Sequence, residues 1–215
     1  MMTTNKLTKT FASGSLAIGV LAGAVLTATS ASAASMVLTW DQWTSGQDLI
    51  QGDKKVTFLS ENGFGAEAVD KVALTQMGDH YYFRYDAMDG LADTNMSSGS
   101  FKYEIEVINS PKSIIGVDLD SNVSSNYGTL TETFAEIPNT LVSVNGSPVP
   151  PSGFIPIAPI KKLTVTNTLS NPNAPNEGLF QLQNSFHQSV PEPGTILGLL
   201  AVGGLGLVSR FKKQK

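Results

Sequence analysis

The side chains best suited to hold a cation lie in one short stretch, where Asp118, Asp120 and Asn122 alternate with other residues. Carboxylate and amide oxygens at alternate positions can converge on a hard cation such as Ca²⁺. The stretch is not an EF-hand, because Val123 and Thr129 stand at the sixth and twelfth positions, which require Gly and Glu. Two interpretations stay open: a looser calcium site in a loop, and an ordinary strand end whose side chains make turn bonds.

Candidates for catalysis are sparse. Asp86, Asp89 and Asp93 form a second acidic cluster after an aromatic run, and a turn at this position favours a solvated loop. The only histidines are His80 and His187, and neither adjoins a nucleophile motif such as G-x-S-x-G. Hydrolysis of a sugar would need two carboxylates in a cleft, and nothing in the sequence pairs them. We therefore expect no enzymatic activity.

Aromatic residues are the remaining candidates for ligand contact, because aromatic faces pack against apolar faces of other rings. A sugar-stacking platform and ordinary core packing are both open for them. Trp40 and Trp43 would point to opposite faces of an extended segment, so we expect one of them in the core. The residues concerned are Trp40, Trp43, Tyr81, Tyr82, Phe83 and Tyr85.

The segments that carry these side chains are predicted to be strands. Residues 101–107 alternate strictly between apolar and charged, as a half-buried strand does. Further β-branched or aromatic runs, separated by turn sequences such as Asn62-Gly63 and Asn145-Gly146, occupy 54–59, 69–75, 81–85, 114–119, 129–134, 141–144, 160–168 and 179–182. Short strands at this spacing predict an all-β, antiparallel sandwich of the jelly-roll or immunoglobulin-like kind. The four prolines of 149–159 predict a loop or an edge crossing there.

The N-terminus has the three parts of a secretory signal peptide. Lys6 and Lys9 precede the apolar run 16–26, and Ala31 and Ala33 form a small-x-small cleavage site. These features predict a signal peptide at 1–33 and a body at 34–189. The chain has no cysteine, which removes thiol nucleophiles and cysteine-based metal sites from consideration.

The C-terminus has a second ordered series. A stiff turn comes first, at Val190, Pro191, Glu192, Pro193, Gly194 and Thr195; the uncharged run 196–208 follows, and a basic end closes the chain at Arg210, Lys212, Lys213 and Lys215. The run would span about 20 Å as a helix, a short membrane span that basic stems can help to complete. Basic residues beside a span stay cytoplasmic, so we expect the body on the opposite side of the membrane.

These residues closely resemble the PEP-CTERM sorting signal of bacteria with an outer membrane, with Pro191, Glu192 and Pro193 matching the motif directly. The resemblance implies export through the Sec translocon, transient residence in the inner membrane and processing by an exosortase near the motif. It also implies release to the cell surface or the extracellular polysaccharide. The body resembles the ectodomains of cyanobacterial PEP-CTERM proteins at 49–58 and 183–188, which implies an architecture and a location but no activity.

Removal of both ends changes the charge. The chain has 14 basic and 18 acidic residues, and the signal and tail take six of the bases, so the body is left at about −10 when Glu192 is counted. An acidic surface argues against nucleic-acid binding. We therefore expect a non-enzymatic structural or binding protein linked to exopolysaccharide, without a cofactor. Two alternatives remain: a carbohydrate- or calcium-dependent adhesive module, and an extracellular hydrolase with an unrecognised carboxylate pair.

Overall fold

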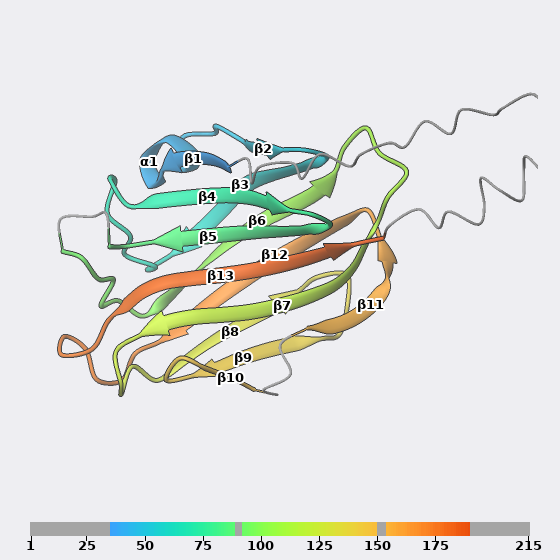
Figure 1. The fold of residues 1–215 in the computed structure, drawn as a ribbon. Coiled ribbons are helices and arrows are strands. Elements are labelled where there is room, and N and C mark those ends of the chain that lie inside the picture. Colours follow the sequence, from blue (N-terminus) through green and yellow to red (C-terminus); the bar gives the residue numbers. More distant parts are fainter. Residues whose placement is uncertain (1–34, 89–91, 150–153, 190–215) are drawn as a thin grey trace, which may run out of the picture.

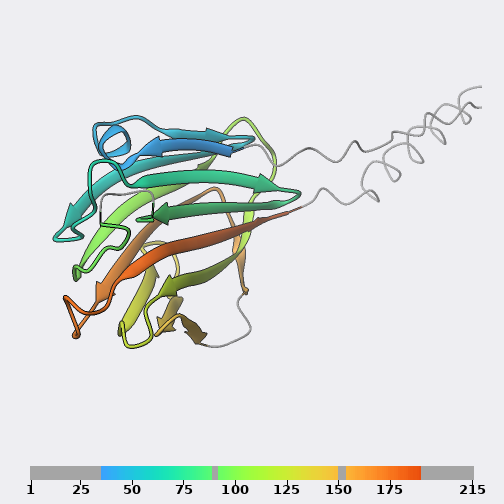
Figure 2. The same ribbon diagram turned by 60° about the vertical axis from the view of Figure 1, so that its left-hand side comes forward.

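Two antiparallel sheets form the molecule, and they lie as two layers in Figure 1 and Figure 2. The computed structural model describes residues 35–88, 92–149 and 154–189. Sheet A has the order β1 (Ser35–Thr39), β4 (Lys71–Met77), β5 (His80–Asp86), β13 (Leu179–Gln188), β7 (Ile114–Val123) and β11 (Ile155–Ile160). Sheet B has the order β10 (Ser147–Val149), β9 (Thr140–Val144), β8 (Thr129–Phe134), β12 (Lys162–Ser170), β6 (Gly99–Val107), β3 (Lys54–Asn62) and β2 (Leu49–Gln51). The predicted all-β sandwich is confirmed.

Alternation along the strands explains the core. In β6, Phe101, Tyr103 and Ile105 are buried and the residues between them face outward. In β12, Leu163 and Val165 follow the same period of two. Because each strand presents one apolar face, two sheets packed face to face bury both sets of side chains in one core.

The segment that contains Trp40 and Trp43 differs from the extended conformation that the sequence interpretation assumed. Residues Trp40–Thr44 form the short helix α1, whose N-terminus is capped by reciprocal hydrogen bonds between Thr39 and Gln42. The helix turns both indoles inward, and Trp40 and Trp43 are only 4% and 0% exposed. They pack on Phe64 and Phe83 with ring centroids 4.9 and 5.1 Å apart, respectively. Neither indole is available to a ligand.

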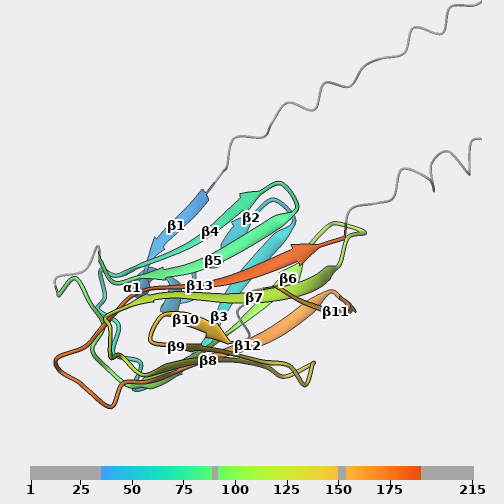
Figure 3. The same cartoon turned by 60° about the horizontal axis from the view of Figure 1, so that its bottom comes forward.

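Two further segments differ in detail from the prediction. The proline-containing stretch supplies β11, an edge strand that pairs with only part of β7, which agrees with the expected edge position. The last strand, β13, runs to Gln188 instead of ending at 182, and it lies in the middle of sheet A between β5 and β7. The β9–β10 hairpin lies next to β7 in Figure 3.

The predicted signal peptide 1–33, with Ala31 and Ala33, and the C-terminal segment 190–215, with the predicted span 196–208, lie outside the described residues. Within the described ranges no helix is long and apolar enough to cross a membrane.

Candidate functional site

The outer face of sheet A carries polar side chains in register across three strands. Pairing aligns Tyr82 of β5 with Ser185 of β13, and Ser185 with Asp118 of β7. The next row across the same strands joins Arg84, Gln183 and Asp120, and the row after it joins Asp86, Gln181 and Asn122. Neighbouring strands lie about 4.8 Å apart and outward residues of one strand about 7 Å apart. The face is therefore a regular array of hydrogen-bonding groups.

Within this array the candidate calcium ligands occupy a strand, which corrects the expected loop or strand end. Asp118, Asp120 and Asn122 all belong to β7 and share its outward face, because they are two residues apart. Burial raises the pKa of the Asp118 carboxyl. The described part of the chain contains no group of three His, Cys, Asp or Glu side chains placed to hold a metal ion. The calcium site therefore remains a prediction.

The array is hollowed around Gln183. Three adjoining hollows of about 460, 340 and 110 Å³ share this side chain as a lining residue. Tyr82 and Arg84 line two of them each, and Asp120 lies in the largest and the smallest. We call this surface, lined by Tyr82, Arg84, Asp118, Asp120 and Gln183, the polar groove.

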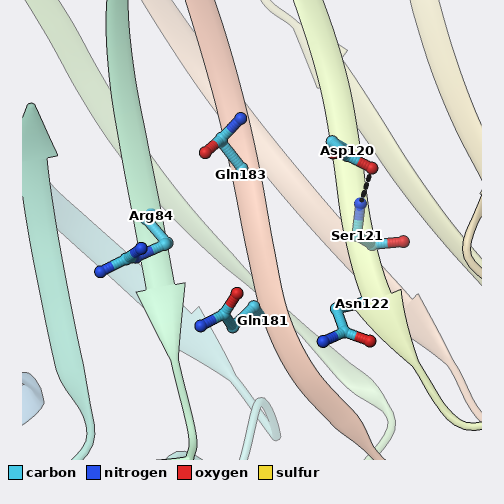
Figure 4. A pocket seen from close by; sticks show the side chains of 6 residues that line it. All are labelled: Arg84, Asp120, Ser121, Asn122, Gln181 and Gln183. Carbon is cyan, nitrogen blue, oxygen red and sulfur yellow. Dashed lines mark hydrogen bonds between the residues drawn. The ribbon is translucent and has the colours of Figure 1, made fainter. Parts of the chain in front are cut away.

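Hydrogen-bonding capacity in the polar groove is largely unused. Figure 4 shows the side chains of the smallest hollow, drawn from β5, β13 and β7. The side-chain amides of Gln183 and Asn122 have no hydrogen-bond partner among the described residues, and Asp120 accepts one bond, from its neighbour's backbone N–H at 2.8 Å. The guanidinium of Arg84 lies 3.8 Å from the carboxylate of Asp86. The amides of Gln183 and Asn122 are therefore free to bind a polar ligand.

One end of the largest hollow is aromatic. The ring of His187 lies between the rings of His80 and Phe154, with both centroid distances 3.8 Å. Phe154 is 36% exposed and covers Gly116, where an added Cβ would lie 1.7 Å from the ring. We call Phe154, His187 and His80 the aromatic shelf. Burial, and then the neighbouring His80, lower the pKa of His187, so its ring is neutral at neutral pH.

The outer face of sheet B is chemically different. Two ion pairs lie on it, Lys162 with Glu104 at 2.9 Å and Lys55 with Glu106 at 3.4 Å. Threonines occupy much of the remainder, and Thr164 donates to Glu136 at 2.8 Å. Such a face is typical of a solvated sheet. The contrast marks the outer face of sheet A as the candidate binding surface.

The other candidates from the sequence fall elsewhere. Tyr81, Phe83 and Tyr85 point into the core, so only Tyr82 of that aromatic run faces outward. Asp86 accepts hydrogen bonds from Gln181 and from the backbone of Met88, and Asp89 lies outside the described residues. The sequence interpretation did not identify the polar groove itself. The alternation of polar and apolar residues in 181–187 was the signal available for β13.

The C-terminal residues 189–213 match the sequence family described as the PEP-CTERM protein-sorting motif. A comparison with curated proteins finds no match for the chain. The chain therefore carries a PEP-CTERM sorting signal at its C-terminus, as the sequence interpretation expected. This signal implies an exported protein that is processed by an exosortase and sorted to the cell surface. The match begins at Ser189, which is also the last described residue of the body.

Proposed function

We propose that this exported protein is a non-enzymatic binding protein of the cell surface that holds a polysaccharide of the extracellular matrix in the polar groove. The observation that carries the proposal is the contrast between the two outer faces: amide groups without a hydrogen-bond partner, beside two carboxyl groups and a flanking aromatic shelf, on sheet A, against ion pairs and threonines on sheet B. Sugars offer many hydroxyls for such groups and apolar ring faces for aromatic rings.

The charge of the polar groove indicates which class of polysaccharide it would bind. The polar groove holds one guanidinium, of Arg84, against the carboxyl groups of Asp118 and Asp120. The body around it is strongly acidic. Like charges repel, so a neutral glycan suits this surface better than one rich in uronic acids.

The experiment is a binding titration of the full chain in detergent against neutral and acidic polysaccharides. The variants Gln183→Ala and Tyr82→Ala should weaken binding to the neutral polysaccharide. The matched control, Thr166→Ala, changes the middle of the outer face of sheet B and should leave binding unchanged. Equal binding by all variants would refute the proposal. A parallel titration with a calcium chelator tests whether the binding depends on calcium.

One observation favours a second candidate, a hydrolase. Asp118 and Asp120 line the same hollow, and burial raises the pKa of Asp118, as an acid catalyst requires. Both residues project from one strand, so they lie on one side of the groove and do not face each other across it. Release of reducing ends from a bound polysaccharide, lost in Asp118→Asn, would establish this activity in place of simple binding.

A further inference from the structure

The end of β13 is held by three other parts of the body. The backbone N–H of Gln188 donates to the carbonyl of Asp79 at 3.0 Å, and its side-chain oxygen accepts from the ammonium of Lys54 at 2.8 Å. Ser189 donates its N–H to the carbonyl of Ser113 at 2.8 Å, and the N–H of Ser113 donates to the Ser189 hydroxyl at 3.0 Å. The sorting motif begins at this tied residue.

Lys54 is the unusual member of this group. Its side chain is fully buried, with the ammonium next to the Asp53 carboxylate and 4.3 Å from the centre of the Tyr81 ring. Burial lowers its pKa. A buried ammonium needs acceptors around it, and Gln188 supplies one from a residue 134 positions away. This bond forms only when the end of β13 is in place. We call the Lys54–Gln188 contact the latch.

The latch lies close to the site of processing. Six residues, 190–195, separate Ser189 from the apolar run, and even a fully extended segment of that length reaches only about 20 Å. An enzyme that binds a peptide segment in extended form needs that segment's backbone groups free. The backbone groups of Phe186 and His187 are not free, because β13 pairs with β5 on one side and β7 on the other (Figure 1).

We propose that the latch controls processing: the sorting enzyme acts on the folded protein only after the end of β13, from Phe186 to Ser189, detaches from the sheet, and Lys54 is the positioning residue that sets how often this happens. Local opening of a strand end is a normal low-energy event in proteins. The processing rate then depends on the fraction of molecules with an open end, and each interaction that closes the end lowers this fraction.

The experiment follows processing of the full chain in the cells that make it, by pulse labelling and mass spectrometry of the surface-associated and secreted forms. Gln188→Leu removes the acceptor and should raise the rate at least about tenfold, the lower limit for one hydrogen bond to a charged group. Gln188→Glu supplies a charged acceptor and should lower it. Gln47→Leu is the matched control, the same change at an exposed glutamine outside the polar groove whose side chain has no hydrogen-bond partner among the described residues.

A spacer makes the test independent of stability. Inserting a Gly-Ser segment between Ser189 and Val190 leaves the latch intact but gives the enzyme free chain, so processing should be fast and no longer respond to Gln188→Leu. Equal processing rates for the parent protein, Gln188→Leu and Gln188→Glu would overturn the proposal. So would a spacer variant whose rate still depends on residue 188. Neither result bears on polysaccharide binding, which is measured separately.

Discussion

Replacing Glu132 by Gln is expected to stabilise the body at neutral pH. Glu132 points inward from β8 between the apolar Leu130 and Phe134, and its side chain is fully buried. Neither carboxyl oxygen has a hydrogen-bond partner among the described residues. The side-chain nitrogen of the nearby Asn184 donates to Asn167 at 3.1 Å.

The magnitude follows from the titration of this one group. Burial raises the pKa of Glu132 well above its usual value. The folded state therefore keeps a proton that the unfolded chain loses near pH 4.3. The stability contributed by the protonated form is complete below that pH and is lost as pH rises toward the folded-state pKa, by about 1.4 kcal/mol per pH unit. Glutamine does not titrate, so Glu132→Gln should abolish this part of the slope.

The assay is guanidinium denaturation between pH 4 and pH 8, followed by the fluorescence of the buried Trp40 and Trp43. Exposed Glu61 provides the control, because Glu61→Gln makes the same chemical change at a carboxyl group outside the core. The same pH slope in Glu132→Gln and in the parent protein would show that Glu132 does not cause it. A variant less stable than the parent at neutral pH would likewise contradict a burial cost at this carboxyl group.

Three further outcomes are expected. Gly116→Ala should displace Phe154 from the aromatic shelf and weaken ligand binding at least severalfold, with circular dichroism unchanged; full binding by a folded variant would contradict the role of the shelf. Trp43→Ala should lower the free energy of unfolding by about 3–5 kcal/mol, because it empties the centre of the aromatic cluster; a loss below about 1 kcal/mol in chemical denaturation would contradict this packing. Removing everything after Ser189 should leave the melting temperature within a few degrees of the parent's, whereas ending the chain before β13 should prevent folding; a large loss in the first case would mean that the body does not end there.

Much of the fold could be predicted from the sequence because the relevant signal is local. Strict alternation in 101–107 identified β6, and the residues around Asn145-Gly146 identified the β9–β10 turn. The segment around Trp40 and Trp43 was less accessible. Its five-residue helix is too short to show a helical period, and tertiary packing of the indoles determines its conformation.

The polar groove could not be predicted in the same way, because strand order creates it. Arg84, Asp120 and Gln183 become neighbours only when the last strand inserts between β5 and β7. The alternation within one strand predicts which of its residues face outward. It does not predict which strands lie next to each other. The sorting signal is the opposite case, since its motif, apolar run and basic end are contiguous in the chain and need no tertiary structure to be recognised.

Binding at the polar groove is tested most directly by the affinity of the full chain for a neutral extracellular polysaccharide, compared between the parent protein, Gln183→Ala and Thr166→Ala. We expect a clear loss of affinity for the groove variant and an affinity equal to the parent's for the sheet B variant. Binding that is unchanged in Gln183→Ala, or reduced equally in both variants, would contradict the assignment of the polar groove as the binding surface.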